Sequence, residues 1–113
     1  MIFIGKAPYR VSLLGGSSDL DWFVKENGYG LCLGYSLDKS SYSVVNVLPK
    51  NSSKGILEYS NREEYSEIEE IVHPIVREVL SNLDISRYIE LKTFGFASGG
   101  SGLGGSGSFM ISL

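Results

Sequence analysis

The chain has 113 residues, 42% of them hydrophobic and 20% charged, which is the composition of one globular domain and excludes a disordered or fibrous protein. Its formal net charge of −3 leaves no excess of positive charge for a nucleic acid or an anionic membrane. No apolar run reaches the roughly 18 residues of a membrane span and no signal-peptide pattern opens the sequence, so we expect a cytoplasmic protein.

The first quarter of the chain predicts strand structure followed by one short helix. Residues 2–8 and 9–14 are mostly apolar segments on either side of a proline break, which predicts two strands or one bent strand. The Gly- and Ser-rich cluster that follows predicts a turn. Its Ser18 or Asp19 would cap a helix that ends at Asn27-Gly28.

The middle of the chain predicts three more strands. Alternating residues over 31–35 and 41–48 predict two neighbouring strands, and 56–60 predicts a third. Cys32 is the only cysteine, which excludes an intrachain disulfide and a cysteine-based zinc site. We expect it to be a small buried side chain.

Residues 63–83 carry apolar side chains at helical spacing. Pro74 lies within this pattern, and because proline is best tolerated in the first turn, we predict that the helix begins there. We interpret the preceding glutamates as a solvated face rather than a metal site; they are Glu63, Glu64, Glu67, Glu69 and Glu70. His73, the only histidine, is placed on the polar side with no chemical role.

The C-terminal part predicts a strand, a glycine-rich loop and the start of a helix. Residues 88–97 alternate and lead directly into the segment 98–108. Seven of the fourteen glycines lie between Gly95 and Gly107. A helix opening near Gly105 would have about two turns before the sequence stops, with an apolar end left uncovered, so we expect a truncated domain.

The glycine-rich loop predicts a phosphate site. Converging backbone N–H groups form a concave anion site, and a helix N-terminus behind them adds partial positive charge. Hydroxyls of Ser101, Ser106 and Ser108 would donate to phosphate oxygens or coordinate Mg²⁺. A flexible linker is the alternative, which the preceding strand, the following apolar run and the lone Leu103 disfavour.

Two common phosphate motifs fit this loop poorly. A P-loop needs a lysine after its glycines, and no lysine follows Lys92. Residues 102–107 satisfy G-x-G-x-x-G, the dinucleotide fingerprint, but that fingerprint opens its domain, whereas here some ninety residues precede it. A dinucleotide-dependent oxidoreductase therefore stays an alternative and not the main hypothesis.

Two motifs carry a resemblance to a known family. Residues 100–109 (Gly-Ser-Gly-Leu-Gly-Gly-Ser-Gly-Ser-Phe) resemble the phosphate-binding motif of the GHMP kinases, the family of galactokinase, homoserine kinase, mevalonate kinase and phosphomevalonate kinase. Residues 6–19 resemble the N-terminal signature of that family. Their Ala-Pro-x-Arg followed by Gly-Gly-x-Ser-Asp is closest to the branch that phosphorylates heptose phosphates, and residues 36–39 continue the likeness.

This resemblance implies an α+β fold, the N-terminal domain of a GHMP kinase, which is similar to domain 2 of ribosomal protein S5. Its sheet is mixed or antiparallel with helices on one face. Residues 1–113 would form an incomplete nucleotide-binding domain from which the C-terminal domain is absent. The implied activity is phosphorylation of a sugar or sugar phosphate, with ATP and Mg²⁺ as cofactors and no nucleic acid or membrane partner.

The resemblance also implies roles for particular residues. Arg10 matches the arginine near the transferring phosphoryl group, so it is the candidate catalytic residue. The candidate acceptor-binding residues are Gly16, Ser17, Ser18 and Asp19, with Asp19 accepting hydrogen bonds from sugar hydroxyls. The candidate nucleotide-binding residues are Gly99, Gly100, Ser101, Gly102, Leu103, Gly104, Gly105, Ser106, Gly107 and Ser108. Ser106 is also the candidate Mg²⁺ ligand.

The sequence departs from the family at several positions. Tyr9 replaces a common glycine, Ser98 a common proline, and Gly105 and Gly107 a common serine or alanine. The family's acidic Mg²⁺ ligand and catalytic aspartate would lie beyond Leu113, so we expect these residues alone to be inactive and to self-associate through uncovered apolar surface. A module that binds a nucleotide or polyol without catalysis is the other alternative.

Overall fold

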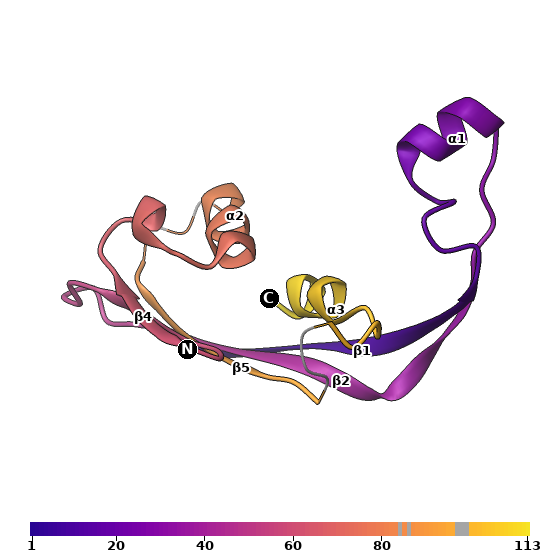
Figure 1. The fold of residues 1–113 in the computed structure, drawn as a ribbon. Helices are drawn as coiled ribbons and strands as arrows, with labels where there is room; N and C mark the ends of the chain where they lie inside the picture. Colours follow the sequence, from indigo (N-terminus) through magenta and orange to yellow (C-terminus); the bar gives the residue numbers. More distant parts are fainter. Residues whose placement is uncertain (84, 86, 97–99) are drawn as a thin grey trace.

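A computed structural model describes residues 1–83, 85, 87–96 and 100–113. Its base is one five-stranded sheet in the order β1-β2-β5-β3-β4, with α2 and α3 over one face (Figure 1). Among the strands that the structure describes, β3 and β5 pair in parallel and the other neighbours are antiparallel. The α+β class with a mixed sheet and helices on one face is therefore confirmed.

The strands are β1 (Ile2–Leu14), β2 (Leu33–Val47), β3 (Gly55–Glu58), β4 (Arg62–Tyr65) and β5 (Ile89–Phe94). The helices are α1 (Asp21–Asn27), α2 (Pro74–Asn82) and α3 (Gly105–Ser112), with a 3₁₀ turn at Ile68–Glu70.

The two longest strands, β1 and β2, form an antiparallel pair. β1 is one strand with register shifts between Pro8 and Arg10 and between Ser12 and Leu14, so the bent-strand alternative is confirmed. The prediction of separate strands over 31–35 and 41–48 is wrong, because β2 runs unbroken through Asp38-Lys39. Asp38-Lys39 lies at a register shift, and β1 pairs with β2 on both sides of it, at residues 33–36 and 40–46.

Residues 15–32, here called the α1 arm, connect β1 to β2 and project away from the helix-covered part of the sheet (Figure 1). The predicted end of α1 is confirmed, since Gly28 closes it in the left-handed conformation at φ 82°. The predicted cap is wrong. Leu20 is the N-cap residue and no side chain caps this helix. No described helix is long and apolar enough to cross a membrane.

The hydrophobic core lies between α2 and the β5-β3-β4 part of the sheet. The buried members of this core are Leu57, Tyr65, Ile71, Val76, Leu80, Ile89 and Leu91. The predicted start of α2 at Pro74 is confirmed. Sequence analysis missed β4, because its Arg-Glu-Glu-Tyr sequence has no apolar alternation and forms a strand only by pairing with β3.

Candidate functional site

The glycine-rich segment 100–108, here called the glycine loop, is fixed to the edge of the sheet. The backbone N–H of Arg10 donates to the carbonyl of Leu103 at 3.1 Å. The hydroxyl of Ser108 donates to the carbonyl of Pro8 at 2.7 Å, and Ser108 is buried. Because β1 is an edge strand, these two bonds satisfy groups that the sheet leaves open. They hold the loop beside Arg10.

The loop has the backbone conformation of an anion cradle. Gly100, Gly102 and Gly104 have φ angles of 79°, 74° and 68°, in the left-handed region that favours glycine. Gly104 is the N-cap residue of α3, and no side chain caps the free N–H groups of the first turn. A Cβ at Gly104 would lie 2.8 Å from Nε of Arg10, so the absence of a side chain allows the close approach of loop and arginine.

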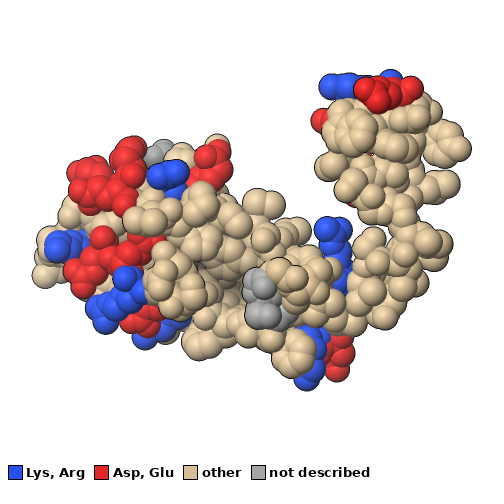
Figure 2. Space-filling model, viewed as in Figure 1, with Lys and Arg blue, Asp and Glu red and all other residues tan. Residues whose placement is uncertain are grey.

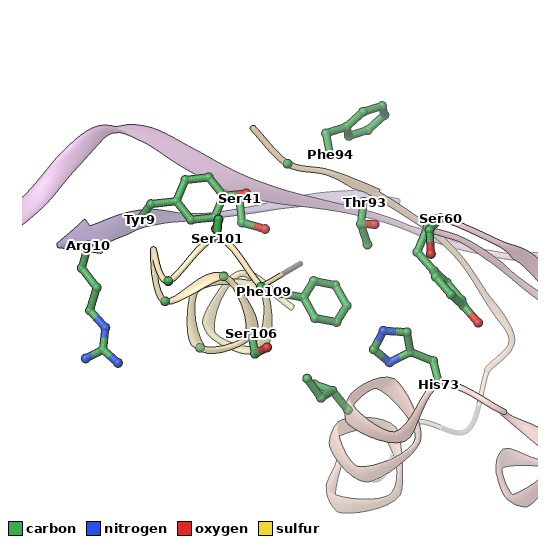
Figure 3. A pocket seen from close by; sticks show the side chains of 18 residues that line it. Tyr9, Arg10, Ser41, Ser60, His73, Thr93, Phe94, Ser101, Ser106 and Phe109 are labelled. Carbon is green, nitrogen blue, oxygen red and sulfur yellow. The ribbon is translucent and has the colours of Figure 1, made fainter. Parts of the chain in front are cut away.

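A hollow of about 590 Å³ extends from the glycine loop along the space between α2 and α3. Figure 3 shows Arg10 and the loop at one end and His73 at the other, with Phe109 between them. Its lining includes most of the described loop residues, and none of the described residues that line it is acidic. None of the ion pairs of the described residues involves Arg10, which leaves its guanidinium free for an anion.

The end of the hollow away from Arg10 is aromatic. The ring of His73 meets that of Tyr59 edge to face, with centroids 4.7 Å apart, and its centroid lies 5.2 Å from that of Phe109. Nδ1 of His73 accepts the N–H of Val76 at 3.4 Å, so this side chain caps α2. The sequence analysis gave His73 no chemical role; its position directly before a proline at a helix start was the available signal for a cap.

The candidate acceptor residues lie apart from this hollow, in the α1 arm. The hydroxyl of Ser18 lies 2.7 Å from the carbonyl of Gly15 and accepts the N–H of Leu31 at 3.1 Å. Ser18 therefore links the two ends of the α1 arm and does not cap a helix. Gly16, Ser17 and Asp19 are exposed beside it. The N-terminal motif is thus divided, because Arg10 lies beside the glycine loop whereas residues 16–19 lie in the α1 arm.

Two further expectations need correction. Cys32 is exposed and not buried, and its thiol donates to the carbonyl of Gly15 at 2.8 Å. The hydroxyl of Ser108 is engaged by Pro8, so it anchors the loop where a phosphate contact was predicted. Gly99 lies outside the described residues.

The Mg²⁺ expected from the resemblance has one candidate ligand in this part of the chain. Ser106 lies in the first turn of α3, is exposed and lines the hollow. The described residues contain no group of three His, Cys, Asp or Glu side chains that could hold a metal ion. A single hydroxyl does not bind Mg²⁺ unaided, so the ion would depend on ligand phosphates or on carboxylates from elsewhere.

The fold has counterparts among solved structures. The structure has the fold of the N-terminal domain of the GHMP kinases, as the sequence motifs predict, and the chain is much shorter than the solved structures with this fold. No protein-family model and no curated protein sequence matches the chain.

Three solved structures illustrate the likeness. A D-glycero-D-manno-heptose 1-phosphate kinase from Bacteriodes thetaiotaomicron matches with TM-score 0.78 and 19% identity, over 99% of this chain and 39% of that chain. The mevalonate kinase of Methanococcus jannaschii matches with TM-score 0.70 and 19% identity, over 99% of this chain and 38% of that chain. The galactokinase of Lactococcus lactis, complexed with galactose, matches with TM-score 0.68 and 20% identity, over 96% of this chain and 30% of that chain. The chain therefore spans less than two fifths of each, and at these identities the likeness concerns the fold.

Proposed function

We propose that this chain is the nucleotide-binding part of an ATP-dependent kinase that phosphorylates a hydroxyl of a sugar or sugar phosphate. The observation that carries the proposal is the attachment of the glycine loop to β1 beside Arg10, with α3 beginning within the loop at Gly105. Phosphoryl transfer asks the protein mainly for positioning and charge neutralisation, and this arrangement supplies both.

In this proposal the nucleotide lies along the hollow. The loop amides from Gly100 to Gly107 and the N-terminus of α3 hold the phosphates, which the partial positive charge there favours. The guanidinium of Arg10, free of ion pairs among the described residues, neutralises charge on the transferring group. The nucleoside extends toward the aromatic end at His73 and Tyr59.

Mg²⁺ would neutralise the phosphate charge, with the hydroxyl of Ser106 as its protein ligand in this chain. Carboxylates that complete the site and remove the acceptor proton would come from outside these residues. For that reason we expect the chain alone to bind nucleotide without turnover. Asp19, Gly16, Ser17 and Ser18 of the α1 arm are proposed to contact the acceptor. The similarity to a heptose phosphate kinase in both motif and fold makes such a sugar phosphate the first acceptor to test.

Calorimetric titration of the chain with Mg-ATP and with NAD is the first test. We expect Mg-ATP to bind and NAD to bind far more weakly, because the sheet is mixed, unlike the parallel sheet of a dinucleotide-binding domain. A preference for NAD would overturn the proposal. Ser106→Ala should weaken Mg-ATP binding, whereas Asp19→Ala should leave it nearly unchanged.

The acceptor needs a second test. A phosphoryl-transfer assay of the complete open reading frame across sugars and sugar phosphates should give a phosphorylated product, and Asp19→Ala should impair use of the acceptor. Mg-ATP binding with no transfer to any acceptor would instead support a module that binds nucleotide without catalysis.

A further inference from the structure

One carboxylate, that of Glu63, connects three elements around the aromatic end of the hollow. Its Oε1 accepts the hydroxyl of Tyr59 at 3.0 Å and the backbone N–H of His73 at 3.3 Å. Its Oε2 accepts the backbone N–H of Val72 at 2.8 Å. The interpretation of all five glutamates as a solvated face is therefore wrong for Glu63. This side chain joins β4 to the residue after β3 and to the start of α2.

We propose that Glu63 is a positioning residue that sets the rings of Tyr59 and His73 so that the hollow accepts a planar base. The inference rests on the proposed function, since the planar group would be the base of the bound nucleotide. Glu63 acts through its neighbours. Its Oε1 accepts the hydroxyl of the Tyr59 ring, so that ring cannot shift without breaking this bond, and the same oxygen holds the backbone from which the His73 ring projects.

The side chain of His73 is fixed at a second point. Because Nδ1 accepts the N–H of Val76, the proton of the neutral ring resides on Nε2. Its plane stands at 82° to that of Tyr59 and at 58° to that of Phe109. Three rings from three elements thus meet at one end of the hollow in edge and tilted contacts, which are favoured arrangements of aromatic groups.

The site requires a carboxylate because all three neighbours of Glu63 are donors. Both oxygens of glutamate accept, whereas glutamine has one accepting oxygen and an NH₂ group that only donates. Glu63→Gln would therefore turn a donor toward Val72 or toward Tyr59 and His73. Glu64 is the matched control. It follows on the same strand but lies on the opposite face, where its ion-pair partners among the described residues are exposed Lys54 and Arg62 at 3.6 and 3.5 Å.

The experiment compares two ligands, Mg-ATP and inorganic tripolyphosphate, by calorimetry on the parent chain, Glu63→Gln and Glu64→Gln. Both variants remove one negative charge, so any general electrostatic effect on a polyphosphate is shared. We expect Glu63→Gln to weaken Mg-ATP by about tenfold relative to tripolyphosphate, since three bonds to a charged group are disturbed. Glu64→Gln should leave the ratio of the two affinities unchanged.

Equal losses for both ligands in Glu63→Gln would mean a merely structural role, and no loss for either ligand would mean no role; either result would overturn the proposal. If the parent chain binds neither ligand, the proposed function fails instead. A ligand-free measurement then decides the positioning role. Burial, with a further contribution from the bond to Glu63 and its negative charge, raises the pKa of Tyr59. This pKa should fall toward 10 in Glu63→Gln, and an unchanged titration would show that Glu63 does not hold Tyr59.

Discussion

The two ends of this molecule differ in how much apolar surface they bury. At the α2 end, Leu57 and Leu91 are fully buried in the core. In the α1 arm no residue of α1 is buried, and Leu31 and Trp22 are 74% and 56% exposed. Figure 2 shows the charged side chains gathered mainly at the α2 end, while most of the arm surface is uncharged. The stability of the chain therefore comes from the α2 end, and the arm presents apolar surface.

This difference separates the glycine loop from residues 16–19, the part of the N-terminal motif that lies in the α1 arm. The glycine loop is fixed by Ser108 and Leu103 to the same sheet that carries the core, so the proposed nucleotide site is supported by buried structure. The proposed acceptor residues around Asp19 depend on the arm, which is closed only by local bonds such as those of Ser18. We expect nucleotide binding to survive changes in the arm.

The largest effect should come from paired truncations in the two regions. Leu91→Ala should lower the free energy of unfolding by about 2–5 kcal/mol, because it removes a fully buried side chain. Leu31→Ala should change it by less than about 0.5 kcal/mol, because the side chain is mostly exposed. Urea unfolding monitored by circular dichroism measures both. Similar losses would remove the distinction between core and arm.

The next effect concerns the support of the loop. Gly104→Ala should destabilise the chain by about 1–2 kcal/mol, because alanine disfavours the positive φ and its Cβ would press on Arg10. It should also weaken Mg-ATP binding. Gly107 is the matched control, since a Cβ there meets nothing within 4 Å and alanine favours the helix by up to about 1 kcal/mol. Equal destabilisation by both substitutions would contradict the account of the loop.

The exposed surface of the arm predicts self-association of the isolated chain. Trp22→Glu should reduce the association constant, because it places a charge in the apolar surface of the arm. The control Met110→Glu introduces the same charge at a similarly exposed residue of α3 and should have a smaller effect. Sedimentation velocity over a concentration series measures both. A monomer at all concentrations would contradict the prediction.

The smallest predicted effect is on the stability of the chain at acidic pH. Hydrogen bonds from the backbone N–H groups of Ser66 and Glu67 lower the pKa of Glu70, which is fully exposed. Because folding favours its ionised form, this contribution is complete above the ordinary pKa of 4.5 and is lost as the pH falls through the lower folded value. Urea midpoints between about pH 6 and pH 3 should decline less steeply for Glu70→Gln. Identical slopes would argue against this bond.

The sequence predicted elements whose signals are local. Pro74 identified the start of α2, Gly28 the end of α1, and the alternation after Tyr88 gave β5. The sequence did not predict the elements whose structure depends on pairing with another strand. β2 continues through the polar Asp38-Lys39 because β1 pairs with the residues on both sides of it, and the charged residues of β4 form a strand because they pair with β3.

For the site, the motifs identified the glycine loop and Arg10, which the fold brings together through β1. The role of Glu63 could not be predicted from spacing, since it depends on bonds to Tyr59 and Val72 across two elements. The burial of Ser108 follows from its bond to Pro8, one hundred residues away in the chain. Such long-range contacts leave no periodic pattern in a sequence.

The most direct test follows the backbone amide signals of the labelled chain by NMR while Mg-ATP is added. The account predicts that the largest shifts occur at the glycine loop from Gly100 to Gly107 and at Arg10, with the aromatic end near His73 next. The amide signals of the α1 arm should not shift. Shifts confined to the arm, or none in the glycine loop at saturating nucleotide, would contradict the central claim.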